Sequence, residues 1–211
     1  MTLQAVTGKG ERRALGPSGL IALADGRRVN VRPSVPQDID GLRAFFAALS
    51  DQGRYFRFMT KLGELSEVMA RRFADADQVR HVALLACATT GGGETVVGEA
   101  RYVIDSDDPG SAEFAVAVAA DWQGLGLARA LLARLSGHAA AAGVRRLVAD
   151  TLAGNAAMLE LARAAGFTVS GNGVDRRLLR LVKELTPTAQ RRPWQRFAVP
   201  VGAELHCSQG G

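Results

Sequence analysis

The chain has 211 residues, enough for one domain, and 47% of them are hydrophobic, which supplies a core and excludes global disorder. Its net charge is +5, and nearly all of its basic residues are arginine. These arginines are scattered without an aromatic-rich motif, so we expect an arginine-rich surface with affinity for an anionic cofactor and no nucleic-acid partner. The N-terminus lacks the apolar core of a secretory signal, and no run approaches the length of a membrane span. We therefore expect a cytoplasmic protein without membrane contact.

The N-terminal part predicts an arm and a hairpin. Residues 1–19 lack periodicity and are interpreted as a flexible arm ahead of a domain over residues 20–186. Short alternating runs at 20–23 and 28–32 flank an Asp-Gly pair, which is a hairpin-turn signal.

Two helices are expected next. Apolar residues at helical spacing predict one from Asp38 to Ser50, and the stretch through Gly53 is interpreted as its end. Ser66, followed by an acidic residue, is typical of an N-cap and predicts a second helix to about Ala76. Residues 54–59 are assigned to neither a helix nor a strand.

Three strands follow, at residues 81–89, 95–105 and 111–119. Short turns join them, so they are most simply antiparallel neighbours. The C-terminal part predicts a strand at 146–150, a helix at 155–165 and two closing strands, 167–170 and 177–182. Residues 187–211 contain three prolines and no periodic pattern, and are interpreted as a tail. This order predicts an α+β domain with a central mixed, mostly antiparallel sheet flanked by helices.

A glycine turn connects the third of the central strands to a helix that Gly143 ends. The turn reads Gln123-Gly-Leu-Gly126-Leu-Ala128. Glycine permits positive φ and the close approach of a ligand, and the first N–H groups of a helix attract anions. We interpret this turn as a cradle for the pyrophosphate of a coenzyme.

Cysteine and histidine are rare. Cys87 and Cys207 are too few for a zinc knuckle or a disulfide framework, and Cys87 lies in an apolar run and is expected in the core. His81, His138 and His206 are isolated, so no metal site is expected. Nothing resembles a Ser-His-Asp or Cys-His nucleophile set, which favours direct attack without a covalent enzyme intermediate.

These motifs, in this order, resemble the GNAT superfamily of N-acetyltransferases over roughly residues 27–183. The family's phosphate signature is Arg or Gln, two residues, Gly, one residue, then Gly or Ala, and it matches Gln123 through Ala128. The family's asparagine-led helix ending in Gly-Phe matches the segment from Asn155 to Phe167. The resemblance implies the GNAT fold and transfer of an acetyl group from acetyl-CoA to an amine.

The chain is most similar to the acetyltransferase domain of bacterial protein-lysine acetyltransferases of the Pat type. The matching residues are Arg32-Pro, Asp38-Ile-Asp, Phe45-Phe, Arg54-Tyr-Phe-Arg-Phe and Ala112-Glu-Phe-Ala. This resemblance implies a protein lysine as acceptor. In Pat-type proteins the domain is usually fused to a nucleotide-sensing or CoA-ligase-like region, and the 211 residues have no room for either.

The resemblance also implies coenzyme contacts. The pantetheine arm is expected along the backbone of residues 116–118 as if it were another strand, with the N–H of Val118 polarising the thioester carbonyl. Asn155 is expected to contact the coenzyme, and it is also typical of a helix N-cap. The expected coenzyme-binding residues are Val116, Ala117, Val118, Gln123, Gly124, Leu125, Gly126, Leu127, Ala128, Arg129 and Asn155.

Glu113 is the candidate general base. A lysine amine has a pKa near 10.4 and is mostly protonated at neutral pH, so a base is useful. Strand alternation places Glu113 with Ala115 and Ala117 on one face, where there is room for a substrate and where partial desolvation would favour a basic role. The resemblance also implies the Pat-type catalytic glutamate here. The alternative is a half-exposed charge near a strand end.

The tyrosine that serves many family members as general acid has Ala162 in its place, so this role is not carried over. A thiol with a pKa near 8.5 leaves readily without much help from an acid. Tyr55 is expected to pack or to contact substrate.

Two alternatives to a protein lysine acceptor stay open. One is a small amine, such as a polyamine, an amino acid or an aminoglycoside, which an acidic patch at the acceptor mouth would favour. The other is a CoA-binding sensor without catalysis, which the missing tyrosine favours and Glu113 opposes. No motif specifies the oligomeric state.

Overall fold

The computed structural model describes residues 18–91 and 93–186. The expected tail over 187–211, and all but the end of the expected arm over 1–19, lie outside the described residues. The strands are β1 (Gly19–Ala22), β2 (Arg28–Pro33), β3 (His81–Thr90), β4 (Gly93–Ile104), β5 (Ser111–Val118), β6 (Arg146–Leu152), β7 (Thr168–Gly171) and β8 (Leu178–Glu184). The helices are α1 (Ile39–Ala48), α2 (Asp51–Phe58), α3 (Glu67–Ala74), α4 (Leu127–Ala141) and α5 (Ala156–Ala164), with short 3-10 turns η1 (Pro36–Asp38) and η2 (Ala120–Trp122).

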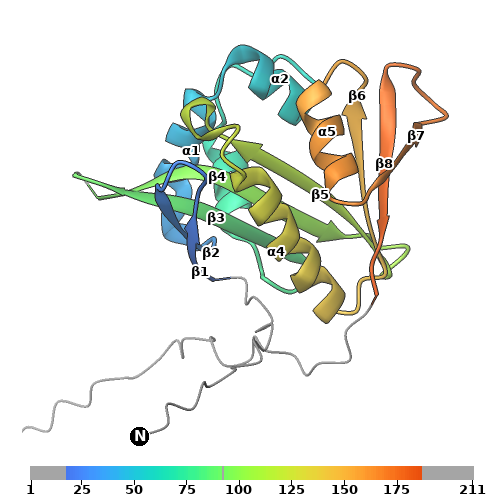
Figure 1. The fold of residues 1–211 in the computed structure, drawn as a ribbon, viewed down its shortest axis with the longest axis horizontal. Coiled ribbons are helices and arrows are strands. Elements are labelled where there is room, and N and C mark those ends of the chain that lie inside the picture. The colour runs from blue at the N-terminus through green and yellow to red at the C-terminus, as the bar shows by residue number, and fades with distance from the viewer. Residues whose placement is uncertain (1–17, 92, 187–211) are drawn as a thin grey trace, which may run out of the picture.

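In the described part of the chain, the strands form one eight-stranded sheet in the order β1-β2-β3-β4-β5-β6-β8-β7 (Figure 1). Neighbouring strands are antiparallel except for β5 and β6, which are parallel. The expected α+β class, the mixed sheet and the antiparallel arrangement of the three central strands are confirmed.

Helices cover both faces of the sheet because its strands bury alternate side chains on opposite sides. Leu84 and Leu85 are consecutive on β3 and belong to different hydrophobic clusters. Leu84 packs in the cluster that contains α4 and α5, and Leu85 packs in the one that contains α1 and α3. Figure 1 shows α4 crossing the sheet on one side.

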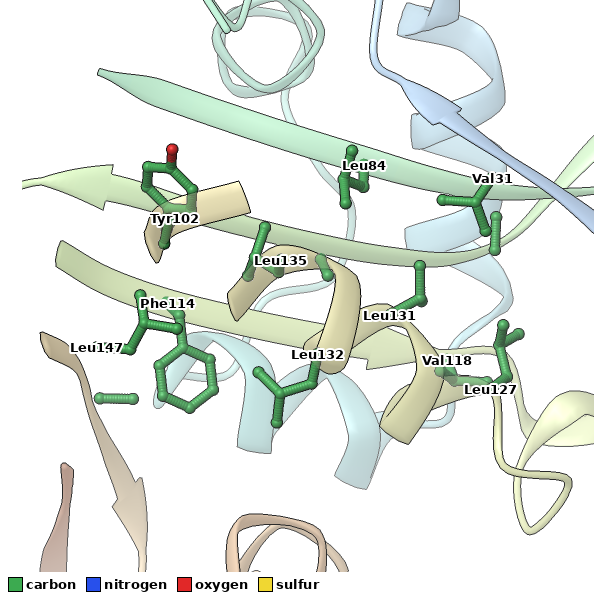
Figure 2. Close-up of a cluster of buried hydrophobic side chains, with 14 of the residues drawn as sticks. Val31, Leu84, Tyr102, Phe114, Val118, Leu127, Leu131, Leu132, Leu135 and Leu147 are labelled. Atoms are coloured by element: carbon green, nitrogen blue, oxygen red, sulfur yellow. The ribbon is translucent and has the colours of Figure 1, made fainter. Parts of the chain in front are cut away.

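Helix α4 supplies the centre of the larger cluster. The expected apolar face is confirmed, since Leu127, Leu131, Leu132 and Leu135 are all at most 1% exposed. Figure 2 shows these leucines pointing toward side chains of the strands beneath them, among them Phe114. The helix therefore packs against β4 and β5. This packing fixes its first turn relative to the end of β5.

The expected end of the first helix at residues 50–53 is wrong. Helix α1 stops at Ala48, and Leu49 is extended with ψ 144°. Ser50 then acts as the N-cap of α2, because its side chain accepts a hydrogen bond from the N–H of Gly53 at 3.0 Å. Helix α2 has no buried residue, so no apolar stripe marks it in the sequence. It was missed for this reason.

Candidate active site

The strands β5 and β6 part in the middle of the sheet. Their parallel pairing runs only from Ser111 opposite Arg146 to Glu113 opposite Val148. Both strands continue beyond this point, β5 to Val118 and β6 to Leu152, without pairing to each other. One backbone edge of residues 114–118 is therefore open to an extended ligand, which can bind there as an added strand binds a sheet edge.

Val116, Ala117 and Val118, which sequence reasoning selected as the pantetheine contacts, all lie on this open segment of β5. The same residues pair with β4 along their other edge, as far as Val118 opposite Gly98. Each is therefore held by the sheet on one side while the other side faces the gap between the strands.

The glycine turn lies directly beyond the open edge. Gly124 and Gly126 have φ values of 71° and 85°, in the left-handed region that favours glycine. The side-chain amide of Gln123 donates to the carbonyl oxygen of Val118 at 2.9 Å and ties the turn to the end of β5. These values confirm that the turn needs glycine.

Helix α4 begins at Leu127, and its N-cap Gly126 has no side chain to satisfy the first N–H groups. Ala128 and the exposed Arg129 complete the first turn. A phosphate group fits such an uncapped helix start, because backbone N–H groups and the helix dipole both favour an anion.

Asn155 lies on the opposite side of the gap, shortly after β6. Its side-chain oxygen Oδ1 accepts from the N–H of Met158 at 3.2 Å, and its side-chain nitrogen Nδ2 donates to the hydroxyl of Thr151 at 3.2 Å. The N-cap role is thus confirmed. The coenzyme contact remains a prediction, and the amide that would make it is already oriented by these two bonds.

Glu113 is the last residue of β5 that pairs with β6, so its Cα stands at the point where the strands part. It is exposed, whereas the flanking Ala112 and Phe114 are buried in the α4 cluster. The expected alternation of faces is confirmed. Glu113 is not buried by the part of the chain that the structure describes, so the expected partial desolvation would have to come from bound substrate or coenzyme.

The position that the general-acid tyrosine takes in many family members is here a buried alanine. Ala162 on α5 is 0% exposed and packs in the same cluster as Phe114 and Phe167. Tyr55 lies elsewhere, on α2, and is 37% exposed. It lines a hollow of about 650 Å³ together with Asp51, Gln52, Lys61, Leu62 and Gly63.

A buried ion cluster lies beneath α2, and sequence reasoning missed it. The carboxylate of Glu99 on β4 is fully buried and accepts hydrogen bonds from Arg101 and Arg57. Burial alone would raise the pKa of Glu99, but the two guanidinium charges outweigh it and hold that pKa below its usual range. Arg101 also donates to Nε2 of His81 at 3.0 Å. The signal was present in the sequence, since residues 99 and 101 are charged and share one face of a mostly apolar strand.

Metal-ligand clusters and membrane-spanning helices are both absent from residues 18–91 and 93–186. No group of three or more His, Cys, Asp or Glu side chains is arranged to hold a metal ion. None of the helices there combines the length and the apolar composition needed to cross a bilayer.

Comparisons with known proteins identify the domain. The family model for the acetyltransferase (GNAT) domain matches residues 28–168. An acetyltransferase of Pseudomonas aeruginosa is 35% identical over 126 residues, which cover 60% of this chain and 67% of that protein.

Solved structures agree with this match. The GNAT domain of S. lividans PAT is 31% identical, with a TM-score of 0.73 over 80% of this chain and 97% of that one. A phosphinothricin acetyltransferase from Sinorhizobium meliloti, solved in complex with acetyl-CoA, is 21% identical and shares the fold, with a TM-score of 0.59 over 78% of this chain and 96% of that one. The chain therefore belongs to the GNAT acetyltransferase family.

Proposed function

We propose that the chain transfers the acetyl group of acetyl-CoA to the side-chain amine of a protein lysine, with Glu113 as general base. One observation carries this proposal. Glu113 is the last paired residue before β5 and β6 part, and the open edge of residues 114–118 begins directly after it. A carboxylate at this point stands at the start of the edge along which the coenzyme arm is proposed to bind, on the side from which an acceptor amine would enter.

The coenzyme would be held by backbone groups more than by side chains. Residues 116–118 offer the open edge for the pantetheine arm, and the turn from Gln123 to Gly126 with the first turn of α4 offers N–H groups for the pyrophosphate. Arg129 adds a positive charge near the phosphates, and Asn155 a polar contact across the gap. Bound acetyl-CoA supplies the activated acyl group.

Glu113 accepts the proton that the amine loses as its nitrogen bonds to the acyl carbon and the carbon–sulfur bond breaks. The N–H of Val118 is the proposed hydrogen-bond donor to the carbonyl oxygen that becomes negative. No tyrosine stands at Ala162 to protonate the sulfur. A thiolate whose conjugate acid has a pKa near 8.5 leaves without such a donor and takes its proton from water.

The acceptor class is inferred from two features. The resemblance of the sequence to Pat-type protein-lysine acetyltransferases favours a protein lysine, and the GNAT domain of S. lividans PAT is 31% identical to this chain. We assign the acceptor entrance to the hollow beside Tyr55, because α2 packs against β5. This hollow carries both Asp51 and Lys61, so it is not the acidic patch that a small polyamine would favour.

The test is to incubate the protein with labelled acetyl-CoA and a cell lysate, and to locate the label by mass spectrometry. We expect label on the lysine side chains of a limited set of proteins. A parallel reaction uses a panel of polyamines, amino acids and aminoglycosides in place of the lysate. Faster turnover on one of these would assign a small amine instead. Binding of acetyl-CoA without transfer to any acceptor would favour the sensor function.

A further inference from the structure

The loop between β1 and β2, residues 23–27, lies against the glycine turn. Strands β2, β3, β4 and β5 are antiparallel in succession, so the start of β2 and the end of β5 lie at the same end of the sheet. In Figure 1 the tip of the blue β1–β2 hairpin lies beside the segment that enters α4. The loop therefore reaches the turn directly from a distant part of the sequence.

Three contacts join the loop to the turn. The N–H of Ala24 donates to the carbonyl oxygen of Leu125 at 3.3 Å, between the two glycines of the turn. Arg27 donates through Nη2 to the carbonyl oxygen of Asp121 at 2.8 Å. Its guanidinium also lies 4.1 Å from the centre of the Trp122 ring. Both the entry and the middle of the turn are thus held from outside.

Arg27 is itself held in place. Its Nε donates to the carboxylate of Asp25 at 2.6 Å, and its backbone N–H donates to the other oxygen of the same carboxylate at 3.0 Å. The planar guanidinium is therefore oriented before it contacts Trp122 and the Asp121 carbonyl. Lysine cannot reproduce this arrangement, because its ammonium is a compact charge without a planar fork.

The hairpin is also anchored to α4 and to the core. Arg134 donates to the carbonyl oxygens of Gly19 and Leu20, at 3.0 and 3.3 Å. Leu23 is buried in the same cluster as Leu127. Residues 18–27 precede the segment that matches the GNAT family model, which begins at residue 28. The support for the turn thus comes from outside the matched domain.

A turn with two glycines gains its shape at an entropic cost, since glycine loses more conformational freedom on ordering than other residues. If the turn were disordered before binding, part of the binding free energy would be lost in ordering it, and the affinity for the ligand would be lower. We propose that the loop of residues 23–27, through Arg27 as a positioning residue, holds the glycine turn ready for the coenzyme. This inference rests on the proposed function of the turn as the acetyl-CoA pyrophosphate site.

The test compares Arg27→Ala with Arg28→Ala. Arg28 is the next residue and is exposed, with no side-chain hydrogen bond or ion pair to the described residues. We expect Arg27→Ala to raise the Kd for CoA in calorimetry, and the KM for acetyl-CoA, about fivefold to tenfold, with kcat within about twofold. Arg28→Ala should stay within about twofold of the wild type in all three. Equal values for the two variants would overturn the proposal.

Arg27→Lys separates positioning from simple attraction of the phosphates. If Arg27 positions the turn, the lysine variant stays nearly as weak as Arg27→Ala. If Arg27 acts only by its charge, the lysine variant binds CoA like the wild type and its affinity has the same salt dependence. That result would overturn the positioning role.

Hydrogen exchange of the wild type gives a measurement that needs no variant. We expect added CoA to slow exchange in the turn and, together with it, at the N–H of Ala24, which donates into the turn. Protection of the turn without protection of Ala24 would overturn the proposal. If the wild type does not bind CoA, the proposed function fails as well. Only the positioning role fails if the wild type binds CoA while CoA does not slow exchange at the Ala24 N–H and Arg27→Ala binds CoA as tightly as the wild type does.

Discussion

Arg57 on α2 donates to the carboxylate of Glu99 on β4 across 3.4 Å inside the protein. The Glu99 side chain is fully buried and is shared with Arg101. The guanidinium of Arg57 also lies 5.2 Å from the ring centre of Phe58. In the sheet, Glu99 stands opposite Ala117 on β5. The pair therefore ties the helix beside the proposed acceptor entrance to β4, the strand that pairs with the proposed coenzyme-binding segment of β5.

Replacing Glu99 with Gln should lower the free energy of unfolding by about 3 kcal/mol, because two buried guanidinium groups lose their common counter-charge. Urea unfolding followed by circular dichroism measures this loss. Glu67→Gln is the control, since Glu67 forms an exposed ion pair with Arg71 one helical turn away, and its removal should leave stability nearly unchanged. Equal losses in the two variants would contradict a structural role for the buried cluster.

Gly126→Ala should weaken coenzyme binding more than it weakens the fold. A Cβ at this position meets no atom within 4 Å, so the cost to the free protein is the strain at φ 85°, about 1 kcal/mol. The added methyl would stand in the cradle where the pyrophosphate is proposed to lie. We expect the KM for acetyl-CoA to rise about tenfold or more, as measured by initial rates.

Gly143→Ala is a closely matched control at the other end of α4. Its φ is 88°, and a Cβ there also meets no atom within 4 Å. It should therefore cost the same strain and lower the melting temperature similarly, while the KM for acetyl-CoA stays at the wild-type value. An equal rise in KM for both variants would mean that strain, not occupation of the cradle, weakens binding.

Features encoded by neighbouring residues were predicted correctly from the sequence. Strand alternation placed Glu113 and Phe114 on opposite faces, and helical spacing identified the buried leucines of α4. The two glycines of the turn could be recognised because the need for glycine there comes from the local backbone conformation alone. Their positive φ values confirm this need. The family signature then connected this local pattern to a coenzyme.

Features that depend on distant residues were not predictable. No local pattern says that β5 leaves β6 after Glu113, because the pairing depends on how the whole sheet twists and closes. The bond between Arg57 and Glu99 joins two segments whose proximity follows only from the fold. The contact of Arg27 with Trp122 has the same origin, since both residues read as ordinary surface side chains in the sequence.

Stability should decrease as the pH falls below 6.5, and His138 is one cause. Its ring lies on α4 in the core, with Nδ1 2.7 Å from the hydroxyl of Tyr102. Burial lowers the pKa of His138 to about 4, whereas in an unfolded chain it is near 6.5. Between these values the unfolded chain takes up a proton that the folded protein does not, so the free energy of unfolding falls with pH. The contribution reaches about 3 kcal/mol near pH 4.

Urea unfolding at pH 7, 6 and 5 measures this slope, and His138→Asn is the control. The variant loses stability at every pH because it disturbs the core, but its slope should be flatter since the titrating group is gone. His81, whose pKa is also lowered by burial and by the charge of Arg101, contributes equally in both proteins and cancels. Parallel slopes in the wild type and the variant would show that His138 does not titrate as proposed.

Glu113→Gln should abolish most of the turnover while sparing the coenzyme. The proposed coenzyme contacts are backbone groups of β5 and of the turn, so the Kd for acetyl-CoA should change less than about twofold. Loss of a general base lowers kcat by about 100-fold to 10,000-fold. Glu160→Gln, on the exposed face of α5, is the control and should retain the wild-type kcat.

The pH dependence of the Glu113→Gln variant distinguishes a base from a merely positioning carboxylate. As the pH approaches 10.4, an increasing fraction of a lysine acceptor is already neutral and needs no base. The ratio of wild-type kcat to variant kcat should therefore become smaller as the pH rises. It is measured with saturating substrates at each pH. A ratio that stays constant over this range would mean that Glu113 orients the acceptor instead of taking its proton.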